Sequence, residues 1–207
     1  TMPEGERRQA LRDGLPAKAG WSWERLAGWL PGGMDAEAWE AAIPNMGYMA
    51  LIRNLRNFDG AGISKQAANA VLAKISDPAE VASSRQLPFR FLSAYRHSSV
   101  KWHGALEEAV RLSLVNVPEL AGSTLVMVDI SGSMKTAMSN ARGRADAQTL
   151  SREDAASVFG AALAVKNPKG VDLYAYDTRS HRIPVKAGAD VLVKAREITT
   201  SGGGGTD

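Results

Sequence analysis

The stretch that decides the fold is Leu125-Val-Met-Val-Asp129-Ile-Ser131-Gly-Ser133-Met134. Four apolar residues lead into Asp129, and two serines follow it at alternate positions. A short apolar run rich in branched side chains predicts a buried parallel strand, and Asp129 falls where that strand ends and the chain turns. Ligands of open α/β sheets gather at the carboxyl ends of the strands. The stretch therefore predicts an α/β sheet with a polar site at its edge.

The polar residues of this turn are a candidate site for Mg²⁺ or another divalent cation. Alternate residues of an extended turn point the same way, so Asp129, Ser131 and Ser133 would offer their oxygens together. Such hard oxygen ligands, with a few retained waters, are what Mg²⁺ prefers. Thr206 would add a hydroxyl, since the glycine run 202–205 before it allows close backbone approach. The alternatives are a Ser/Gly loop that only turns the chain and a plain glycine linker.

Composition narrows the class of protein. The chain has 207 residues, 44% of them hydrophobic, a net charge of +3 and no cysteine. Disulfides, thiolate zinc sites and cysteine nucleophiles are therefore excluded, which fits a reducing, cytoplasmic setting. No apolar run approaches the roughly 18 residues of a membrane span, and no signal peptide is visible. There is no phosphate-binding loop and no serine nucleophile elbow, so we expect no catalysis.

The hydrophobic pattern changes near Pro118, which divides the chain into a helical region (1–117) and a region of alternating strands and helices (118–207). In the first region we predict helices from Asn45 to about Phe58, Ser64 to about Ser76, and from Asp77, Pro88 and Lys101 onward. In the second we predict strands over 124–129, 171–176 and 182–186, and helices over 151–166 and 189–197. The apolar face of helix 151–166 is predicted to be Ala155, Val158, Phe159, Ala162 and Leu163.

Several segments together carry a family resemblance. The segments are Met49-Ala-Leu-Ile-Arg-Asn-Leu-Arg-Asn-Phe58, Leu87-Pro-Phe-Arg-Phe-Leu-Ser-Ala-Tyr95, Trp102 and the Asp129 motif. From residue 44 on, the chain resembles the Ro autoantigen (TROVE domain) family, in which a ring of HEAT-like helical repeats is closed by a von Willebrand factor A domain. The pattern Asp-x-Ser-x-Ser followed by a distant Thr is similar to the metal-ion-dependent adhesion site of that domain. Residues 1–43 are assigned to the repeats only by continuity.

The resemblance implies the end of the TROVE repeats over 1–117 and the first half of a von Willebrand factor A domain over 118–207. A sheet that stopped there would leave strand 124–129 without a neighbour on one side. We therefore expect a fragment from the C-terminal side of a longer protein, or a sheet that another chain completes. The last Asp of the adhesion-site pattern would lie beyond residue 207.

The resemblance also implies a non-catalytic RNA-binding protein. Its expected partners are small noncoding Y-type RNAs and the single-stranded ends of misfolded RNAs in RNA quality control. Through its RNA, such a protein can be tethered to polynucleotide phosphorylase. Neither DNA nor a membrane is an expected partner. The competing interpretation is a metal-dependent protein-interaction module whose helices form only a scaffold and bind no RNA.

A basic stretch supports the RNA interpretation in part. Between residues 53 and 101 there are eight basic and three acidic residues, and such groups bind phosphates without reading sequence. The interleaved rings of Phe89, Tyr95 and Trp102 could stack on unpaired bases. The alternative is a solvated basic face over a core of aromatic residues. The candidate RNA-binding residues are Arg53, Arg56, Arg90, Arg96 and Lys101.

Overall fold

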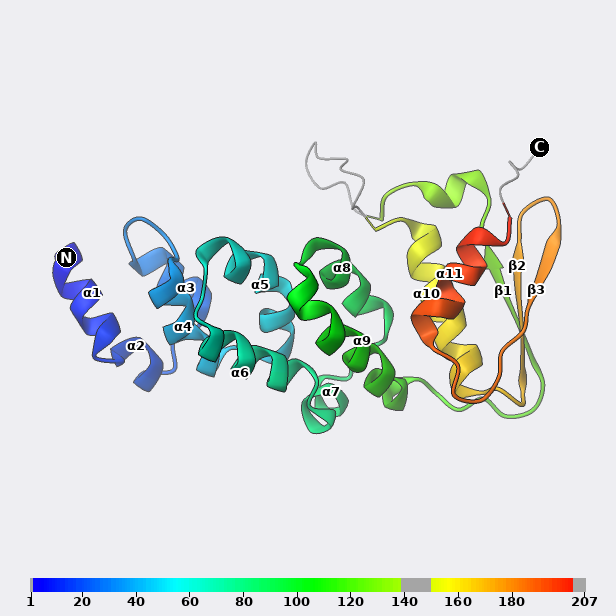
Figure 1. The fold of residues 1–207 in the computed structure, drawn as a ribbon, viewed down its shortest axis with the longest axis horizontal. Coiled ribbons are helices and arrows are strands. Elements are labelled where there is room, and N and C mark those ends of the chain that lie inside the picture. Colours follow the sequence, from blue (N-terminus) through cyan, green and yellow to red (C-terminus); the bar gives the residue numbers. More distant parts are fainter. Residues whose placement is uncertain (1, 139–149, 203–207) are drawn as a thin grey trace.

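A computed structural model describes residues 2–138 and 150–202 of the chain. The molecule is elongated, with the N-terminal helices at one end and a small sheet at the other (Figure 1). The α-helices are α1 (Glu4–Arg12), α2 (Leu15–Lys18), α3 (Trp23–Trp29), α4 (Ala36–Ala42), α5 (Tyr48–Ala61), α6 (Lys65–Ile75), α7 (Pro78–Ser84), α8 (Phe89–His97), α9 (His103–Leu112), α10 (Arg152–Lys166) and α11 (Val191–Thr200). The strands are β1 (Thr124–Asp129), β2 (Val171–Tyr176) and β3 (Ser180–Ile183).

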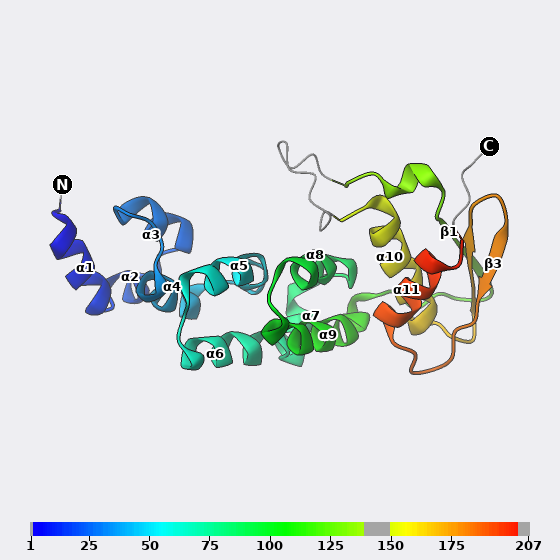
Figure 2. The same cartoon turned by 45° about the horizontal axis from the view of Figure 1, so that its top comes forward.

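Helices α5 and α6, and then α8 and α9, form two successive helical pairs. In two views α5 and α8 lie in one row and α6 and α9 in the other (Figures 1 and 2). Helix α5 also packs against α8, and α6 against α9, so the second pair stacks on the first. The contacts bury the apolar faces of all four helices. This arrangement is the helical-repeat architecture that the sequence predicts.

Local capping signals fix where several of these helices begin. Ser64 accepts a hydrogen bond from the Ala67 amide at the start of α6, and Asp77 does the same for Glu80 in α7. Helix α5 begins at Tyr48 and not near Asn45, so that prediction is wrong. Residues Ile43–Asn45 form a 3₁₀ turn, and the Asn45 side chain donates its amide to the Ala17 carbonyl at 2.8 Å instead of capping a helix.

A row of aromatic rings runs through the helical core. Trp23 lies 5.6 Å from Trp39, Trp39 lies 5.2 Å from Phe58, and Phe58 lies 6.5 Å from Trp102, all between ring centroids. Trp39, Phe58 and Trp102 are buried. Two of these contacts are edge-on, and such large rings stabilise small helical units by apolar burial and by ring geometry. Two of the five tryptophans, Trp39 and Trp102, are therefore core residues, and the other three are partly buried and pack against the core.

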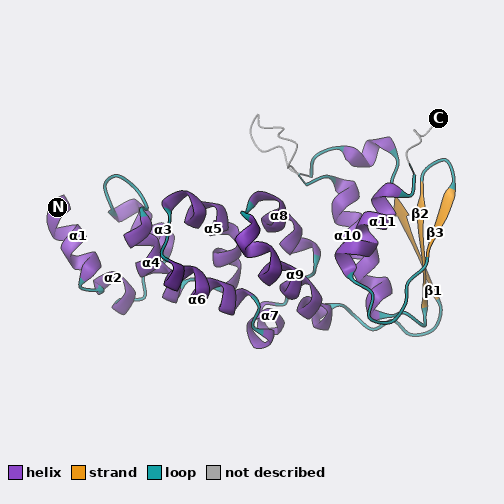
Figure 3. Cartoon of the chain, in the orientation of Figure 1, coloured by secondary structure: helices purple, strands orange, loops and turns teal. Residues whose placement is uncertain are grey.

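The three strands form a mixed sheet in the order β1-β2-β3. Strand β1 pairs in parallel with β2, with Asp129 opposite Tyr176, and β3 returns antiparallel to β2. Helix α10 makes the crossover between the two parallel strands, and both α10 and α11 cover the same face of the sheet (Figure 3). Close packing of α10 on β1 occurs at Gly160, where an added Cβ would lie 2.6 Å from the Val128 side chain.

Three details of the predicted α/β pattern differ from the structure. Strand β3 ends at Ile183, before Pro184, because proline has no amide hydrogen to continue the ladder. The last helix extends to Thr200 instead of 197. The predicted apolar face of α10 is wrong at Phe159, which is 42% exposed, since α10 buries small residues such as Ala161 and Ala164 against the sheet and α11.

Within the described residues, β1 pairs only with β2 and lies at the edge of the sheet. Val126 and Val128 point towards α10, so Leu125 and Met127 face the other way and are 60% and 50% exposed. The edge position of the most apolar strand is the arrangement that the sequence predicts for this order of elements. No described helix is long and apolar enough to cross a membrane.

Candidate functional site

The structure brings Asp129, Ser131 and Ser133 together at the carboxyl end of β1. The Ser131 amide donates to Asp129 Oδ1 at 2.8 Å, and the Ser131 and Ser133 hydroxyl oxygens lie 3.2 Å apart. Ser131 is buried, Asp129 is half-buried and Ser133 is exposed. One carboxylate and two hydroxyls thus share one turn, and their chemistry fits a hard cation that keeps part of its water shell. Thr206, the fourth predicted ligand, lies outside the described residues.

Asp177 is a second carboxylate at this end of the sheet, and our sequence reasoning missed it. It directly follows β2, and its side chain is only 4% exposed. Its Oδ1 accepts a hydrogen bond from the Arg179 amide at 2.9 Å and lies 3.4 Å from His181 Nε2. The signal was available, because the carboxyl ends of neighbouring parallel strands meet at one edge.

The start of the glycine run lies against the same edge. A Cβ added to Gly202 would lie 2.5 Å from Asp177 Oδ2 and 2.6 Å from Ile130 Cδ1, so only glycine fits there without a shift. The chain therefore returns to the carboxyl ends of β1 and β2 shortly before Thr206. Within the ranges 2–138 and 150–202, no three His, Asp or Glu side chains gather in a way that could hold a metal. Any cation here would therefore depend on hydroxyl oxygens and water as well as on carboxylate.

The turn after β1 is attached to the first turn of α10. The Arg152 amide donates to the Thr136 carbonyl at 3.1 Å, and the Met138 amide donates to the Leu150 carbonyl at 2.8 Å. Glu153 is buried in this region, and burial raises its pKa even though Lys135 acts in the opposite direction. A shift of the serine turn would therefore also displace the first turn of α10, because these hydrogen bonds connect the two.

Three of the five candidate RNA-binding residues lie exposed on α5 and α8 without an acidic partner among the described residues. Arg53 and Arg56 lie on the exposed side of α5, and neither makes an ion pair with any other described residue. Arg90 is exposed on α8, and its guanidinium lies 5.1 Å from the centre of the Phe89 ring. Because α5 packs against α8, the three guanidinium groups belong to adjoining surfaces of the repeat stack.

The other two candidates already have acidic partners. Arg96 binds the Asp154 carboxylate, and Lys101 Nζ lies 2.7 Å from Asp59 Oδ1. Their charges are therefore partly neutralised within the protein, which weakens their attraction for a phosphate. Of the five candidates, only Arg53, Arg56 and Arg90 keep charges that no described carboxylate compensates.

The three aromatic rings that were predicted to stack on RNA bases have different surroundings in the structure. Trp102 is fully buried and donates its indole N–H to Asp59 at 2.9 Å, so the prediction that it stacks on a base is wrong. Tyr95 stacks on His103 with 4.1 Å between ring centroids, and its hydroxyl donates to Glu107 at 2.8 Å. Phe89 is half-buried beneath Arg90. The aromatic core interpretation therefore holds for Trp102.

The fold defines a class of protein in which HEAT-like helical repeats lead into a partial α/β domain. Residues 19–102 match the TROVE domain, so the chain carries TROVE sequence and the predicted family resemblance is confirmed. The match begins well before residue 44, and it extends the recognisable part of the family to α3 and α4. It includes all five candidate RNA-binding residues.

Individual relatives agree with this assignment. The chain is 40% identical over 76 residues to Telomerase protein component 1 of Mus musculus and, to the same extent, to that of Rattus norvegicus. This segment is 36% of the chain but only 3% of each relative. The crystal structure of the Ro (RSR) protein of Deinococcus radiodurans superposes with a TM-score of 0.70 at 20% identity. That likeness, which concerns the fold, covers 93% of this chain and 40% of the Deinococcus chain.

Proposed function

We propose that the chain is part of a Ro-like RNA-binding protein that acts without catalysis in cytoplasmic RNA quality control. The observation that carries this proposal is the placement of Arg53, Arg56 and Arg90 inside the TROVE match, exposed and without acidic partners among the described residues. Unpaired guanidinium groups bind phosphates strongly because their N–H groups donate in pairs to the phosphate oxygens. Y-type RNA and the single-stranded ends of misfolded RNA are the proposed ligands.

A filter-binding assay with single-stranded RNA at two salt concentrations tests this proposal. In the variant Arg53→Glu/Arg56→Glu we expect weaker binding and a shallower salt dependence, by about 0.7 in the logarithmic slope for each phosphate that is no longer neutralised. The matched control is Lys169→Glu/Arg179→Glu, which changes the net charge equally at exposed positions of the α/β region. If the two variants bind RNA with equal affinity, α5 is not part of the RNA-binding surface.

The proposal includes polynucleotide phosphorylase as a partner that is held through RNA and not by direct contact. Because both proteins would bind the same RNA, co-purification should be abolished by ribonuclease treatment. It should also be weaker in the Arg53→Glu/Arg56→Glu variant than in the Lys169→Glu/Arg179→Glu control. Co-purification that survives ribonuclease would instead indicate a protein–protein contact.

We further propose a divalent cation, Mg²⁺ in the first instance, at Asp129, Ser131, Ser133 and Thr206. The support is the convergence of the first three at the end of β1 and the return of the chain at Gly202. The ion would supply an open coordination position for a partner's carboxylate, or it would stiffen the loops. Isothermal titration with Mg²⁺ tests the site, and Asp129→Asn should abolish the binding.

The competing function is a metal-dependent protein-interaction module without RNA binding. It is favoured by one observation, that Arg96 and Lys101 are engaged with carboxylates and so leave a smaller basic surface than the sequence suggested. The two functions respond differently to chelation. An RNA-binding surface on α5 and α8 should keep its affinity in EDTA, whereas a carboxylate-binding metal site should lose its partner.

A further inference from the structure

The serine turn (131–136) is joined to the start of α10 by a short antiparallel pairing of the backbone. Ala137 forms a β-bridge with Ser151, and the Arg152 amide donates to the Thr136 carbonyl at 3.1 Å. Because Arg152 is the first residue of α10, its amide has no partner within the helix, and the Thr136 carbonyl supplies one. The position of the turn and the position of the helix start therefore depend on each other.

Thr136 also fixes the backbone of Ser133, one of the proposed cation ligands. Its hydroxyl donates to the Ser133 carbonyl at 2.8 Å, and its amide donates to the same oxygen at 3.4 Å. The Ser133 hydroxyl in turn lies 3.2 Å from the Ser131 hydroxyl. Thr136 and Ser133 are exposed, so packing does little to hold them and these hydrogen bonds set the position of the ligand. Thr136 thus connects a proposed ligand to α10.

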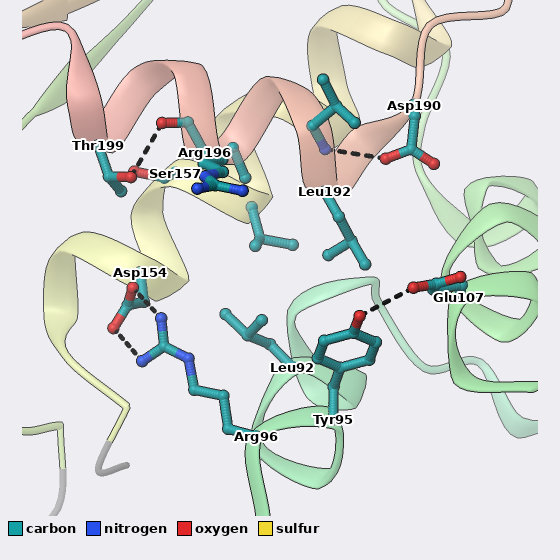
Figure 4. Close-up of a pocket in the computed structure, with 13 residues that line it drawn as sticks. Leu92, Tyr95, Arg96, Glu107, Asp154, Ser157, Asp190, Leu192, Arg196 and Thr199 are labelled. Atoms are coloured by element: carbon teal, nitrogen blue, oxygen red, sulfur yellow. Dashed lines mark hydrogen bonds and ion pairs between the residues drawn. The ribbon is translucent and has the colours of Figure 1, made fainter. Parts of the chain in front are cut away.

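The start of α10 is held by Asp154, which lies in the first turn of the helix. Its carboxylate accepts the Ser151 amide at 2.9 Å and forms an ion pair with Arg96 of α8. Figure 4 shows Arg96 pointing from α8 towards Asp154. The two side chains are only 32% and 16% exposed, so removal of either one would leave the other as a partly buried charge without its partner.

Incomplete packing at this junction increases the importance of the ion pair. A cavity of about 610 Å³ lies between α8, α9, α10 and α11, and both Arg96 and Asp154 line it (Figure 4). Protein interiors are normally close-packed, so a space of this size means that apolar side chains of the four helices make fewer contacts here than in a filled core. The placement of the α10 start against α8 therefore depends strongly on the Arg96–Asp154 pair.

We propose that Thr136, Asp154 and Arg96 are positioning residues of the cation site, and that they couple cation binding to the docking of α10 on α8. The inference rests on the cation site proposed above. Arg96 holds Asp154, Asp154 holds the start of α10, and α10 holds Thr136, which fixes Ser133. A cation bound to the Ser133 hydroxyl would hold the same turn from its other end. Docking and cation binding therefore favour each other, and linkage makes the two effects equal in size.

Isothermal titration of the 207-residue chain with Mg²⁺ tests the role of Thr136. Thr136→Val keeps the branched shape but removes the hydroxyl, and we expect Mg²⁺ affinity to fall about threefold to fivefold, as for the loss of one hydrogen bond. Thr136→Ser keeps the hydroxyl and should bind as the parent does. If Thr136→Val binds Mg²⁺ as tightly as the parent, the proposal fails while the cation site stands. If the parent binds no Mg²⁺, the cation site fails as well.

Arg96→Met tests the coupling to the repeat region, and we expect it to weaken Mg²⁺ binding about threefold under conditions in which the protein is fully folded. Arg111→Met, which removes an exposed ion pair with Glu108, should leave the affinity unchanged. Asp59→Asn is the control for lost stability, because Asp59 pairs with Lys101 within the repeats. An effect of Asp59→Asn as large as that of Arg96→Met would overturn the coupling, since lower stability alone would then account for the weaker binding.

Hydrogen exchange of the Arg152 amide gives the reciprocal measurement, because this amide joins α10 to the serine turn. Saturation with Mg²⁺ should slow its exchange about threefold in the parent, as the turn and the helix start are held together more firmly. The gain should be smaller in Thr136→Val. If Mg²⁺ binds to the parent but leaves the exchange of this amide unchanged, the cation site is not coupled to α10.

Discussion

Arg96 and Asp154, 58 residues apart in the chain, form a two-pronged ion pair that joins the repeat region to the α/β region. Arg96 Nη1 donates to Asp154 Oδ2 at 2.6 Å, and Nη2 donates to Oδ1. The same carboxylate completes the capping box of α10, because it also accepts the Ser151 amide at 2.9 Å and the Ser151 hydroxyl at 2.6 Å. The Asp154 side chain thus helps to cap the start of α10 and, through Arg96, attaches this helix to α8.

Removal of this ion pair should destabilise the junction. For Arg96→Met we expect the free energy of unfolding to fall by about 1–3 kcal/mol, between the values for exposed and buried pairs, since the two side chains are 32% and 16% exposed. A double-mutant cycle with Asp154→Asn, measured by urea denaturation, should give a coupling energy above about 1 kcal/mol. The control is Arg111→Met, which removes an exposed pair with Glu108. Additive effects of Arg96→Met and Asp154→Asn would show that the pair contributes nothing.

Acid should weaken the ion pair between Arg96 and Asp154. It should also weaken the contacts of Asp59 with Lys101 and Trp102. Burial alone would raise the pKa of Asp154 and of Asp59, but hydrogen bonds from Arg96 and Ser151 to the first, and from Lys101 and Trp102 to the second, outweigh it and lower both. Aspartate in an unfolded chain titrates at about pH 3.9. The stabilisation is therefore present above about pH 4 and is lost as the pH falls towards the lower folded-state values.

The measurement is urea denaturation from about pH 6 down to about pH 3, the window in which these carboxylates gain protons. The parent should lose stability steeply at the acid end, whereas Asp59→Asn/Asp154→Asn should be less stable near neutral pH but decline less. Asp172→Asn is the control, because Asp172 is in an exposed pair with Arg182. An unchanged acid slope in the double variant would show that other carboxylates govern acid unfolding.

The elements that the sequence predicted best are those with a local cause. Ser64, Asp77 and Ser151 cap the helices that follow them, and each cap acts within the first turn of its helix. The serine turn after Asp129 is equally local, and it forms as the alternate spacing suggested. The short apolar run also located β1 correctly, but the prediction that this strand is buried holds for one face only, since Leu125 and Met127 are exposed.

What the sequence could not predict depends on contacts between distant segments. Helix α10 packs against two partners, the sheet and α11, and together they decide which of its side chains are buried. The helical periodicity of the sequence alone therefore placed Phe159 wrongly on the buried face. Whether a basic residue is free also depends on the fold, since Arg96 and Lys101 look like Arg53 and Arg56 until their acidic partners are known. The cavity between α8, α9, α10 and α11 has no local signature at all.

Gly160 should be sensitive to the smallest enlargement. A Cβ there would lie 2.6 Å from Val128 Cγ2 and 3.5 Å from Val126 Cγ1, so Gly160→Ala must separate α10 from β1. We expect a loss of about 1–3 kcal/mol in the free energy of unfolding, as for other overpacked cores. Gly104→Ala in α9 is the control, because its Cβ would meet no atom within 4 Å, and alanine at this exposed helix position should stabilise the protein by up to about 1 kcal/mol. Equal stability of both variants in urea would contradict the packing of α10.

Gly202 tests whether the glycine run belongs to the cation site. In Gly202→Ala the new methyl group would meet Asp177 Oδ2 at 2.5 Å and Ile130 Cδ1 at 2.6 Å, so either the chain or these two side chains must shift at the sheet edge that holds Asp129. Because the glycine run leads directly to Thr206 in the sequence, we expect Mg²⁺ affinity by isothermal titration to fall about fivefold to tenfold, or about 1 kcal/mol. Gly132→Ala is the control, since it lies between the two serine ligands but its Cβ would meet nothing within 4 Å. If Gly202→Ala binds Mg²⁺ as well as the parent, the close approach of Gly202 to the sheet edge plays no part in the proposed site.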